Sequence, residues 1–580
     1  MALLAVTAVA ARGLDDGWGD RMHAAALVER FADAWADRDV AALYELIDPT
    51  SRSGLSPERF RELHRDADAT ATTERVDVGA PVSHGDVHDV PVTVHTRMFG
   101  ELRATLRVRT TGDGEATRVR WSPEMTFPGL RAGETVSRTT RMPPRADLLD
   151  RDGRVIVSGP ARRPTDGPYA DAARAVAGWL GPAHPDDRPA LERLGVPSDV
   201  HVGAGGLERL LDEALTGRPG GVLRAGDRVL AKADPVAAGP VRSAVSLPLI
   251  QTMRAAQSTA PSTHGAVALN ARTGEVLAFD GVAWSALQPP GSVMKIVTVA
   301  AALEHGVTRR SARYASTTRA AGIENADGAR CGGTLTVAFA RSCNSVFAPM
   351  AQRLGAERLV RAAERFGFNR PLGVAGSAVS SVPWPNGPGE LAQTGIGQAR
   401  TTATPLQVAL VTATIANDGR RPTPTFLRRT DPADAVRVVS PTVARQVRRL
   451  MVAAVADGTG GAAGVPGLTV AGKTGTAELR ATQGVACEPP AVSGAGAPAL
   501  GACGNRDGRS TTAWMTAFAD AADGTPGDPI VVTVMRAENH QGGRTAAPVA
   551  AAVLAAAHAD ADAPVDTAPP RAEPGARPAR

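Results

Sequence analysis

One apolar helix pattern in this chain carries a lysine in its first turn. Residues 293–305 read VMKIVTVAAALEH, an almost continuous apolar run that follows Pro289, Pro290 and Gly291 and stops at Gly306. A fold that buries this helix must also bury Lys295. The chain uses lysine at three positions only, Lys232, Lys295 and Lys473, among 64 basic residues. A lysine on a buried helix therefore calls for a chemical explanation.

Ser292 stands three residues before Lys295, so the two side chains share one helix face, one turn apart. A serine hydroxyl at a helix N-terminus lies where negative charge is favoured, but it reacts well only when a base removes its proton. A neutral amine can do this, whereas a guanidinium does not lose its proton in proteins. Lowering the pKa of an amine from about 10.4 to about 7 costs roughly 4.6 kcal/mol, and burial and a second cation can supply it. Ser292 and Lys295 are therefore the candidate nucleophile and base.

Two further short motifs follow in the chain. Ser342-Cys343-Asn344 stands at the head of another predicted helix, and Lys473-Thr474-Gly475-Thr476 lies on a predicted strand, where glycine lets a substrate backbone approach. The order S-x-x-K, S-x-N, K-T-G is the three-part signature of serine acyl-transferring enzymes that act on D-alanyl peptides and β-lactams. The chain thus resembles a class B penicillin-binding protein, a peptidoglycan D,D-transpeptidase.

Other segments extend this resemblance over most of the chain. Arg145 and residues 150–153 match the family's R-G-x-I-x-D-R-x-G segment, with Ala146 in place of the usual glycine. Residues 394–409, TGIGQARTTATPLQVA, are similar to the family's G-x-G-Q and T-P-x-Q box. The N-terminal part resembles the nuclear-transport-factor-like extension found in methicillin-resistance-type enzymes.

The resemblance implies a role for each motif residue. The penultimate D-Ala carbonyl of a stem peptide would acylate Ser292, with Lys295 as the base. Ser342 would relay a proton, and Asn344 would hold Lys295 and the substrate backbone.

The third motif would bind the substrate. Lys473, Thr474 and Thr476 would receive its carboxylate, Gly475 would lie along its backbone, and Lys473 would be the second cation that lowers the pKa of Lys295. The backbone N–H groups of Ser292 and Thr476 would form an oxyanion hole. No cofactor is implied.

Hydrophobic periodicity predicts a multidomain α+β chain. Leu27, Phe31 and Trp35 recur at spacing four, Asp39 caps a second helix, and alternating residues in 90–98, 102–110 and 117–121 predict antiparallel strands that complete a cone-shaped domain. For the C-terminal domain the family resemblance implies a serine transpeptidase/β-lactamase-like fold, an antiparallel sheet flanked by helices with an all-helical subdomain. The predicted parts are a residual export or anchor segment (1–20), the N-terminal cone (21–132), a pedestal or dimerisation domain (133–250), the transpeptidase domain (251–560) and a disordered tail (561–580).

The four cysteines form two close pairs, Cys331 with Cys343 and Cys487 with Cys503. An oxidising compartment would permit two disulfides, and buried free thiols are the alternative. We favour the 487/503 pair because it would close a flexible loop. The apolar start of the chain, about ten residues, is too short to span a bilayer and is either the end of an export or anchor segment or an ordinary apolar first turn. The family resemblance implies an extracytoplasmic protein at the outer face of the cytoplasmic membrane or cell wall, whose anchor is incomplete in this chain.

Composition and residue spacing argue against nucleic-acid, metal and nucleotide binding. A net charge of +5 with scattered arginines and 4% aromatic residues argues against nucleic-acid binding, and the histidines lack metal-ligand spacing. Residues 467–474 satisfy the P-loop pattern, but they alternate like a strand and no helix follows the lysine. The expected partners are D-Ala-D-Ala stem peptides, β-lactams as covalent inhibitors, and cell-wall synthesis or division proteins. A D,D-carboxypeptidase, or a β-lactam-binding or β-lactam-hydrolysing protein of the same fold, remains the alternative, although no E-x-x-L-N-like deacylating motif follows Asn344.

Overall fold

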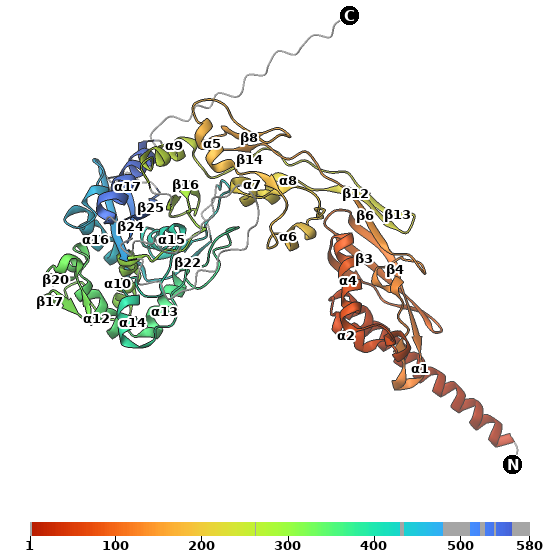
Figure 1. Ribbon diagram of the computed structural model, residues 1–580. Helices are drawn as coiled ribbons and strands as arrows, with labels where there is room; N and C mark the ends of the chain where they lie inside the picture. Colours follow the sequence, from red (N-terminus) through yellow and green to blue (C-terminus); the bar gives the residue numbers. More distant parts are fainter. Residues whose placement is uncertain are drawn as a thin grey trace, which may run out of the picture. The chain divides into compact units, whose positions relative to one another are not determined.

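The computed structural model describes residues 3–260, 263–429, 434–478, 511–521, 528–538 and 541–559 (Figure 1). They divide into two compact units, which we describe separately. Unit 1 takes in Met1–Leu148, Ser158–Arg163 and Gly178–Val241. Unit 2 takes in Leu149–Val157, Pro164–Ala177 and Arg242–Arg580.

Unit 1 begins with helices and a curved antiparallel sheet. The helices are α1 (Leu3–Ala36), α2 (Val40–Leu46), α3 (Pro49–Arg52) and α4 (Pro57–Ala71). The strands are β1 (Thr73–Val78), β2 (Val82–His84), β3 (Val87–Thr96), β4 (Gly100–Thr111) and β5 (Arg118–Val119), in the order β1-β3-β4-β5 with β2 paired to β3. The 3₁₀ turns η1 (Gly114–Ala116) and η2 (Pro123–Thr126) flank β5. The predicted cap is present, because Asp39 Oδ1 accepts the Ala42 N–H at 3.0 Å.

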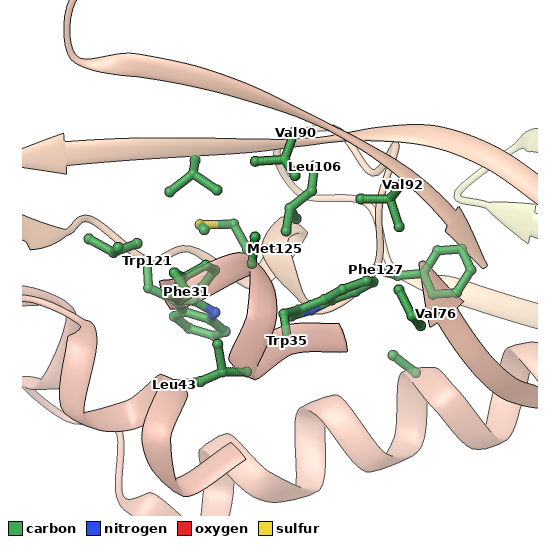
Figure 2. Close-up of a cluster of buried hydrophobic side chains, with 14 of the residues drawn as sticks. Phe31, Trp35, Leu43, Val76, Val90, Val92, Leu106, Trp121, Met125 and Phe127 are labelled. Carbon is green, nitrogen blue, oxygen red and sulfur yellow. The ribbon is translucent and has the colours of Figure 1, made fainter. Parts of the chain in front are cut away.

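The core of this part lies between the helices and one face of the sheet (Figure 2). Phe31 and Trp35 project from α1 because residues four apart share a helix face, and both are buried. Val90 and Val92 of β3 point toward them because alternate strand residues share a sheet face. The predicted arrangement of amphipathic helices against a curled sheet is confirmed.

The rest of unit 1 is built around a small sheet and a buried ion-pair network. Strands β6 (Val136–Arg141), β12 (Gly220–Ala225) and β13 (Arg228–Ala233) pair in the order β13-β12-β6, and β10 (Leu180–Gly181) pairs with β11 (Val202–Gly203). The helices are α6 (Arg188–Arg193), α7 (Gly206–Leu210) and α8 (Asp212–Thr216). Glu208, 1% exposed, accepts hydrogen bonds from Arg145 and Arg162, both at 2.7 Å. Two guanidinium groups therefore offset the cost of burying this carboxylate.

Short strands lie where the chain passes between the units. They are β7 (Leu148–Leu149), β8 (Val155–Ser158), β9 (Arg163–Pro164) and β14 (Val241–Arg242), in the order β14-β7-β8-β9. Within unit 2, the fully buried Asp150 accepts the N–H groups of Asp152 at 2.9 Å and Arg154 at 2.8 Å. Asp150 thus stabilises the tight turn that the D-R-x-G segment predicts.

The centre of unit 2 is a five-stranded antiparallel sheet. Its strands are β15 (His264–Asn270), β16 (Val276–Gly281), β23 (Leu468–Glu478), β24 (Thr511–Ala521) and β25 (Ile530–Glu538), in the order β16-β15-β25-β24-β23. Helices α9 (Leu247–Ala256) and α17 (Gly542–Ala559) pack together against it. Helices α15 (Pro405–Ala416) and α16 (Pro441–Ala456) pack against it through β24 residues Thr516 and Phe518. This order makes β23, which carries the K-T-G motif, an edge strand.

Helices and short hairpins complete unit 2. The helices are α5 (Ala170–Ala177), α10 (Lys295–Glu304), α11 (Leu335–Ala340), α12 (Asn344–Leu354), α13 (Ala356–Arg365) and α14 (Gly387–Thr394), with 3₁₀ turns η3 (Gly291–Met294), η4 (Ala326–Gly328) and η5 (Gly461–Ala463). The hairpins pair β17 (Arg313–Thr317) with β20 (Cys331–Thr334), β18 (Arg319–Ala320) with β19 (Ile323–Glu324), and β21 (Arg420–Pro422) with β22 (Ala435–Arg437). The predicted fold class, a sheet flanked by helices with a helical subdomain, is confirmed.

Some details differ from the sequence analysis. Helix α1 runs unbroken through the boundary predicted after residue 20, and no helix among the described residues is long and apolar enough to cross a membrane. Short hairpins lie among the helices of the subdomain that we predicted to be all-helical, because their strands are specified by tertiary contacts rather than by periodicity. Cys487, Cys503 and the tail at 561–580 lie outside the described residues, and the predicted domain limits stay predictions.

Candidate active site

The loop that carries Ser292 is fixed against the sheet. Ser292 lies in η3, half-buried, immediately before α10. The Pro289 carbonyl accepts hydrogen bonds from Thr512 Oγ1 and Trp514 Nε1 of β24, both at 2.9 Å. Gly291 has φ +55°, and a Cβ there would lie 2.5 Å from the Thr476 carbonyl oxygen. Only glycine fits this turn, which brings Ser292 against the K-T-G strand.

Lys295 is the first residue of α10 and is fully buried. Its Nζ donates to three oxygens of the S-x-N turn: the Ser342 carbonyl at 2.8 Å, Ser342 Oγ at 3.1 Å and Asn344 Oδ1 at 2.7 Å. It also lies 5.6 Å from the centre of the Phe347 ring. The buried amine thus has a complete set of acceptors, all from the second motif.

Lys473 approaches the same hydroxyl from β23. It too is fully buried, and its Nζ donates to Ser342 Oγ at 3.0 Å and to the Thr474 carbonyl at 2.9 Å. It lies 5.8 Å from the centre of the Phe339 ring, which packs edge-on against Phe347. Two amines from segments 178 residues apart in the chain therefore meet at one serine oxygen.

The electrostatics favour neutral amines. Burial, and then the charge of Lys473, holds the pKa of Lys295 well below its usual value. Burial alone lowers the pKa of Lys473 to about 7. Among the described residues, no carboxylate contributes to either shift. Near neutral pH the site can therefore hold one amine as a proton acceptor beside one as a cation.

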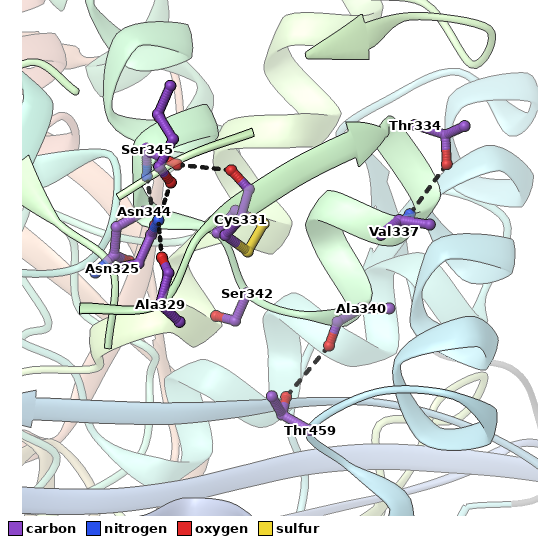
Figure 3. Close-up of a disulfide and its surroundings, with 12 residues drawn as sticks. Asn325, Ala329, Cys331, Thr334, Val337, Ala340, Ser342, Asn344, Ser345 and Thr459 are labelled. Carbon is purple, nitrogen blue, oxygen red and sulfur yellow. Dashed lines mark hydrogen bonds between the residues drawn. A yellow bond between two sulfur atoms is a disulfide. The ribbon is translucent and has the colours of Figure 1, made fainter. Parts of the chain in front are cut away.

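The S-x-N turn is held in an unusual backbone conformation. Ser342 joins α11 to α12 with φ +58°, a left-handed value that costs a non-glycine residue about 1 kcal/mol or more. A disulfide between Cys343 and Cys331 of β20 lies beside it (Figure 3), which confirms one of the two predicted pairs. Asn344 Nδ2 donates to the Glu324 carbonyl at 2.8 Å, so its Oδ1 is turned toward Lys295. These contacts explain how the strained turn persists.

The K-T-G strand lies directly against the serine loop. A Cβ at Gly475 would lie 2.6 Å from the Pro290 carbonyl oxygen, so this position also requires glycine. Thr476 is half-buried, and its Oγ1 accepts the Gly542 N–H at 3.4 Å. Thr474 is 6% exposed, and its hydroxyl lies 2.6 Å from Thr459 Oγ1.

The structure thus brings all eight predicted site residues to one place, and their chemical roles stay predictions. Sequence reasoning missed Thr459, which stands in the glycine-rich segment 458–464, and Phe339 and Phe347, which occupy apolar positions of helices α11 and α12. No local pattern marks these three residues, because each becomes informative only through contacts between distant segments. Residues 468–474 lie on β23, so the P-loop pattern has no strand–loop–helix context.

Comparisons with known proteins agree with this geometry. Residues 264–555 match the family of the penicillin binding protein transpeptidase domain, and residues 23–134 match the NTF2-like N-terminal transpeptidase domain. The chain is similar to the peptidoglycan D,D-transpeptidase PbpA of Mycobacterium tuberculosis, with 38% identity over 217 residues, 33% of this chain and 43% of that relative. It is also similar to penicillin-binding protein PbpB of Mycolicibacterium smegmatis, with 30% identity over 345 residues, 49% of this chain and 53% of that relative.

These matches span less than two thirds of either relative. A crystal structure of Mycobacterium tuberculosis penicillin binding protein 3, complexed with aztreonam, has the same fold, with a TM-score of 0.54 and 24% identity over 73% of this chain and 98% of that chain. The transpeptidase match alone takes in half of the chain and contains all three motifs. This protein therefore belongs to the penicillin-binding protein transpeptidase family.

Proposed function

We propose that this protein is a serine D,D-transpeptidase that cross-links peptidoglycan stem peptides through an acyl-enzyme on Ser292. The observation that carries the proposal is the convergence of Lys295 and Lys473 on Ser342 Oγ, at 3.1 and 3.0 Å. The name of PbpA, a peptidoglycan D,D-transpeptidase, supports the substrate class.

Acylation begins when Ser292 Oγ attacks the carbonyl carbon of the penultimate D-Ala. The neutral Lys295 amine takes the hydroxyl proton, a form of catalysis that contributes about 10²–10⁴-fold. The bond to the terminal D-Ala nitrogen then breaks. Ser342 Oγ gives its proton to the leaving amine and regains one from Lys295, so the proton balance closes and an ester remains on Ser292.

Substrate binding falls to the K-T-G strand. A substrate backbone adds along the edge strand β23, as extended peptides commonly do, with Gly475 leaving room for it. Thr474, Thr476 and the Lys473 cation receive the terminal carboxylate. The backbone N–H groups of Ser292 and Thr476 stabilise the oxyanion, and one such donor is typically worth about 3–4 kcal/mol.

Transfer completes the reaction. An amine of a second stem peptide attacks the ester carbonyl, Lys295 takes a proton from that amine, and Ser292 leaves with a proton restored to its oxygen. A new amide bond links two strands. In a β-lactam the leaving nitrogen stays tethered to the acyl group, so the same ester persists as an inhibited enzyme.

The disulfide supports a site of action outside the cytoplasm, because such bonds persist in oxidising compartments. There the enzyme would meet stem peptides, β-lactams, and cell-wall synthesis or division proteins as partners. The NTF2-like part and the predicted pedestal would serve as its support.

A labelling experiment tests the proposal. The wild-type protein should form one stable adduct with a fluorescent penicillin, found on Ser292 by peptide mass spectrometry, and Ser292→Ala should form none. Lys295→Arg should lose acylation because a guanidinium cannot take the proton. Lys232→Arg, at the exposed third lysine, is the matched control and should label normally. Labelling at another residue would refute the assignment of the site.

Product analysis separates the alternatives. Incubation with stem-peptide strands should yield cross-linked dimers. Free D-Ala without dimers would assign a D,D-carboxypeptidase instead, since water then replaces the amine. Rapid release of the penicillin adduct would favour β-lactam hydrolysis.

A further inference from the structure

Thr459 lies in a loop that is in close contact with three elements around the site. It follows α16 in the sequence Asp457-Gly458-Thr459-Gly460. A Cβ at Gly458 would lie 2.4 Å from the Ala340 carbonyl oxygen at the end of α11, and a Cβ at Gly543 would lie 2.5 Å from the Thr459 carbonyl oxygen. Glycines on both sides thus let the loop touch α11, α17 and β23 together.

The hydrogen bonds of Thr459 join two of the motifs. Its N–H donates to the Ala340 carbonyl at 3.1 Å, two residues before Ser342. Its Oγ1 lies 2.6 Å from Thr474 Oγ1 and 3.5 Å from the same Ala340 carbonyl, the contact drawn in Figure 3. Thr459 is exposed whereas Thr474 is buried, so this hydroxyl pair reaches from the strand to solvent.

Counting the available protons and acceptors indicates which of the two hydroxyls donates. The hydroxyls of Thr459 and Thr474, 2.6 Å apart, form one hydrogen bond, in which one hydroxyl donates its single hydrogen to a lone pair of the other. Thr459 Oγ1 has two acceptors in reach: the Ala340 carbonyl lies at 3.5 Å, beyond the usual O–H···O distance, whereas Thr474 Oγ1 lies at 2.6 Å. The Thr459 proton is therefore best donated to Thr474 Oγ1. This leaves the Thr474 proton free to be donated onward.

We propose that Thr459 is a positioning residue for the substrate carboxylate: it accepts no substrate bond itself but orients the Thr474 hydroxyl so that its proton points to the carboxylate. This inference rests on the proposed function, in which Thr474 binds that carboxylate. A hydrogen bond to a charged group is stronger than a neutral one, so the direction of a single proton matters here. Thr459 thus acts on ligand recognition and leaves the Ser292–Lys295 chemistry unchanged.

The test compares Thr459→Val, which keeps the shape and removes the hydroxyl, with Thr459→Ser, which keeps the hydroxyl. The probes are benzylpenicillin and its methyl ester, which lacks the charged carboxylate. We expect Thr459→Val to slow acylation by benzylpenicillin about tenfold, in line with the loss of one charge-directed hydrogen bond. Acylation by the methyl ester should stay within about twofold, and Thr459→Ser should match wild type with both probes. Since Thr474 transmits the effect, Thr459→Val should add nothing in a Thr474→Val background.

Acylation by the methyl ester also reports whether the variant is folded. Equal slowing with both probes, or no slowing with either, would overturn the inference, and so would additive effects of the two substitutions. These outcomes leave the proposed function intact as long as the wild-type protein forms its adduct on Ser292. If the wild type forms no adduct with either probe, the proposed function fails and this inference falls with it.

Discussion

Replacing Lys473 with methionine should raise the pKa of Lys295. Because the two amines lie 3.1 and 3.0 Å from the same oxygen, they are at most about 6 Å apart, and unit charges at that distance repel by about 3 kcal/mol at an effective dielectric constant of about 20. That energy corresponds to about 2 pKa units. The pKa of Lys473 is itself about 7, so its charge is only partly present at neutral pH. We therefore expect the pKa of Lys295 to rise by about 1–2 units.

The sign of the effect on catalysis follows from the proposed role of Lys295 as a base. Acylation needs the neutral amine, so the rate falls as pH drops through the pKa of Lys295. In Lys473→Met this acid limb should move to higher pH. The lowered rate at pH 7 should recover in part at pH 9, where the amine is neutral again.

The scarcity of lysine permits a direct assay. With three lysines in the chain, lysine labelled with ¹³C at Cε yields three side-chain NMR signals, each of which can be titrated. The exposed Lys232 is the internal reference, and Lys232→Met is the matched control, expected to change neither buried signal. A pKa of Lys295 that stays within about 0.3 units in Lys473→Met would refute the coupling, since charge repulsion at this distance predicts a larger shift.

Three further changes test the supports of the site. Gly475→Ala should slow acylation by about 10²-fold, because its Cβ would lie 2.6 Å from a backbone oxygen of the serine turn and a displacement near 1 Å usually has an effect of this size. The control Gly389→Ala, with no atom within 4 Å of its Cβ, should leave the rate of penicillin labelling unchanged. Replacing both disulfide cysteines with alanine should lower the free energy of unfolding by about 3 kcal/mol in urea titrations. A reductant should then destabilise the wild type and leave this variant unaffected, and equal sensitivity would contradict the role of the bond. Phe347→Leu should lower the pKa of Lys295 by up to about 1 unit, because the ring stabilises the ammonium form; an acid limb that moves to higher pH would contradict this account.

The motif residues were predictable because their local requirements are visible in the chain. Ser292 and Lys295 share a helix face by spacing alone, and the choice of lysine over arginine marks a group that must lose a proton. Gly475 was predicted to leave room for a substrate backbone; in the structure the atom nearest to a Cβ at this position is the Pro290 carbonyl oxygen, at 2.6 Å. These inferences needed no tertiary information.

Other features depend on contacts between distant segments and were out of reach. Thr459 belongs to the site only because the fold brings its hydroxyl to 2.6 Å from that of Thr474. Phe347 belongs to it because its ring centre lies 5.6 Å from Lys295 Nζ. The left-handed backbone of Ser342 has no local signature in S-C-N. Cysteine spacing permitted two disulfides, and we favoured the 487/503 pair, which lies outside the described residues; the structure contains the other pair, because sequence separation says little about which sulfur atoms meet.

The complete burial of two of the three lysines also affects how this protein can be handled. Lys232, on β13 of unit 1, is the one lysine side chain that water reaches, and all three positions belong to the described part of the chain. Among the lysine side chains, succinimidyl esters and similar amine-directed reagents should therefore modify Lys232 and spare Lys295 and Lys473. A fluorophore, a resin or a cross-linker attached to Lys232 would leave both buried amines unmodified.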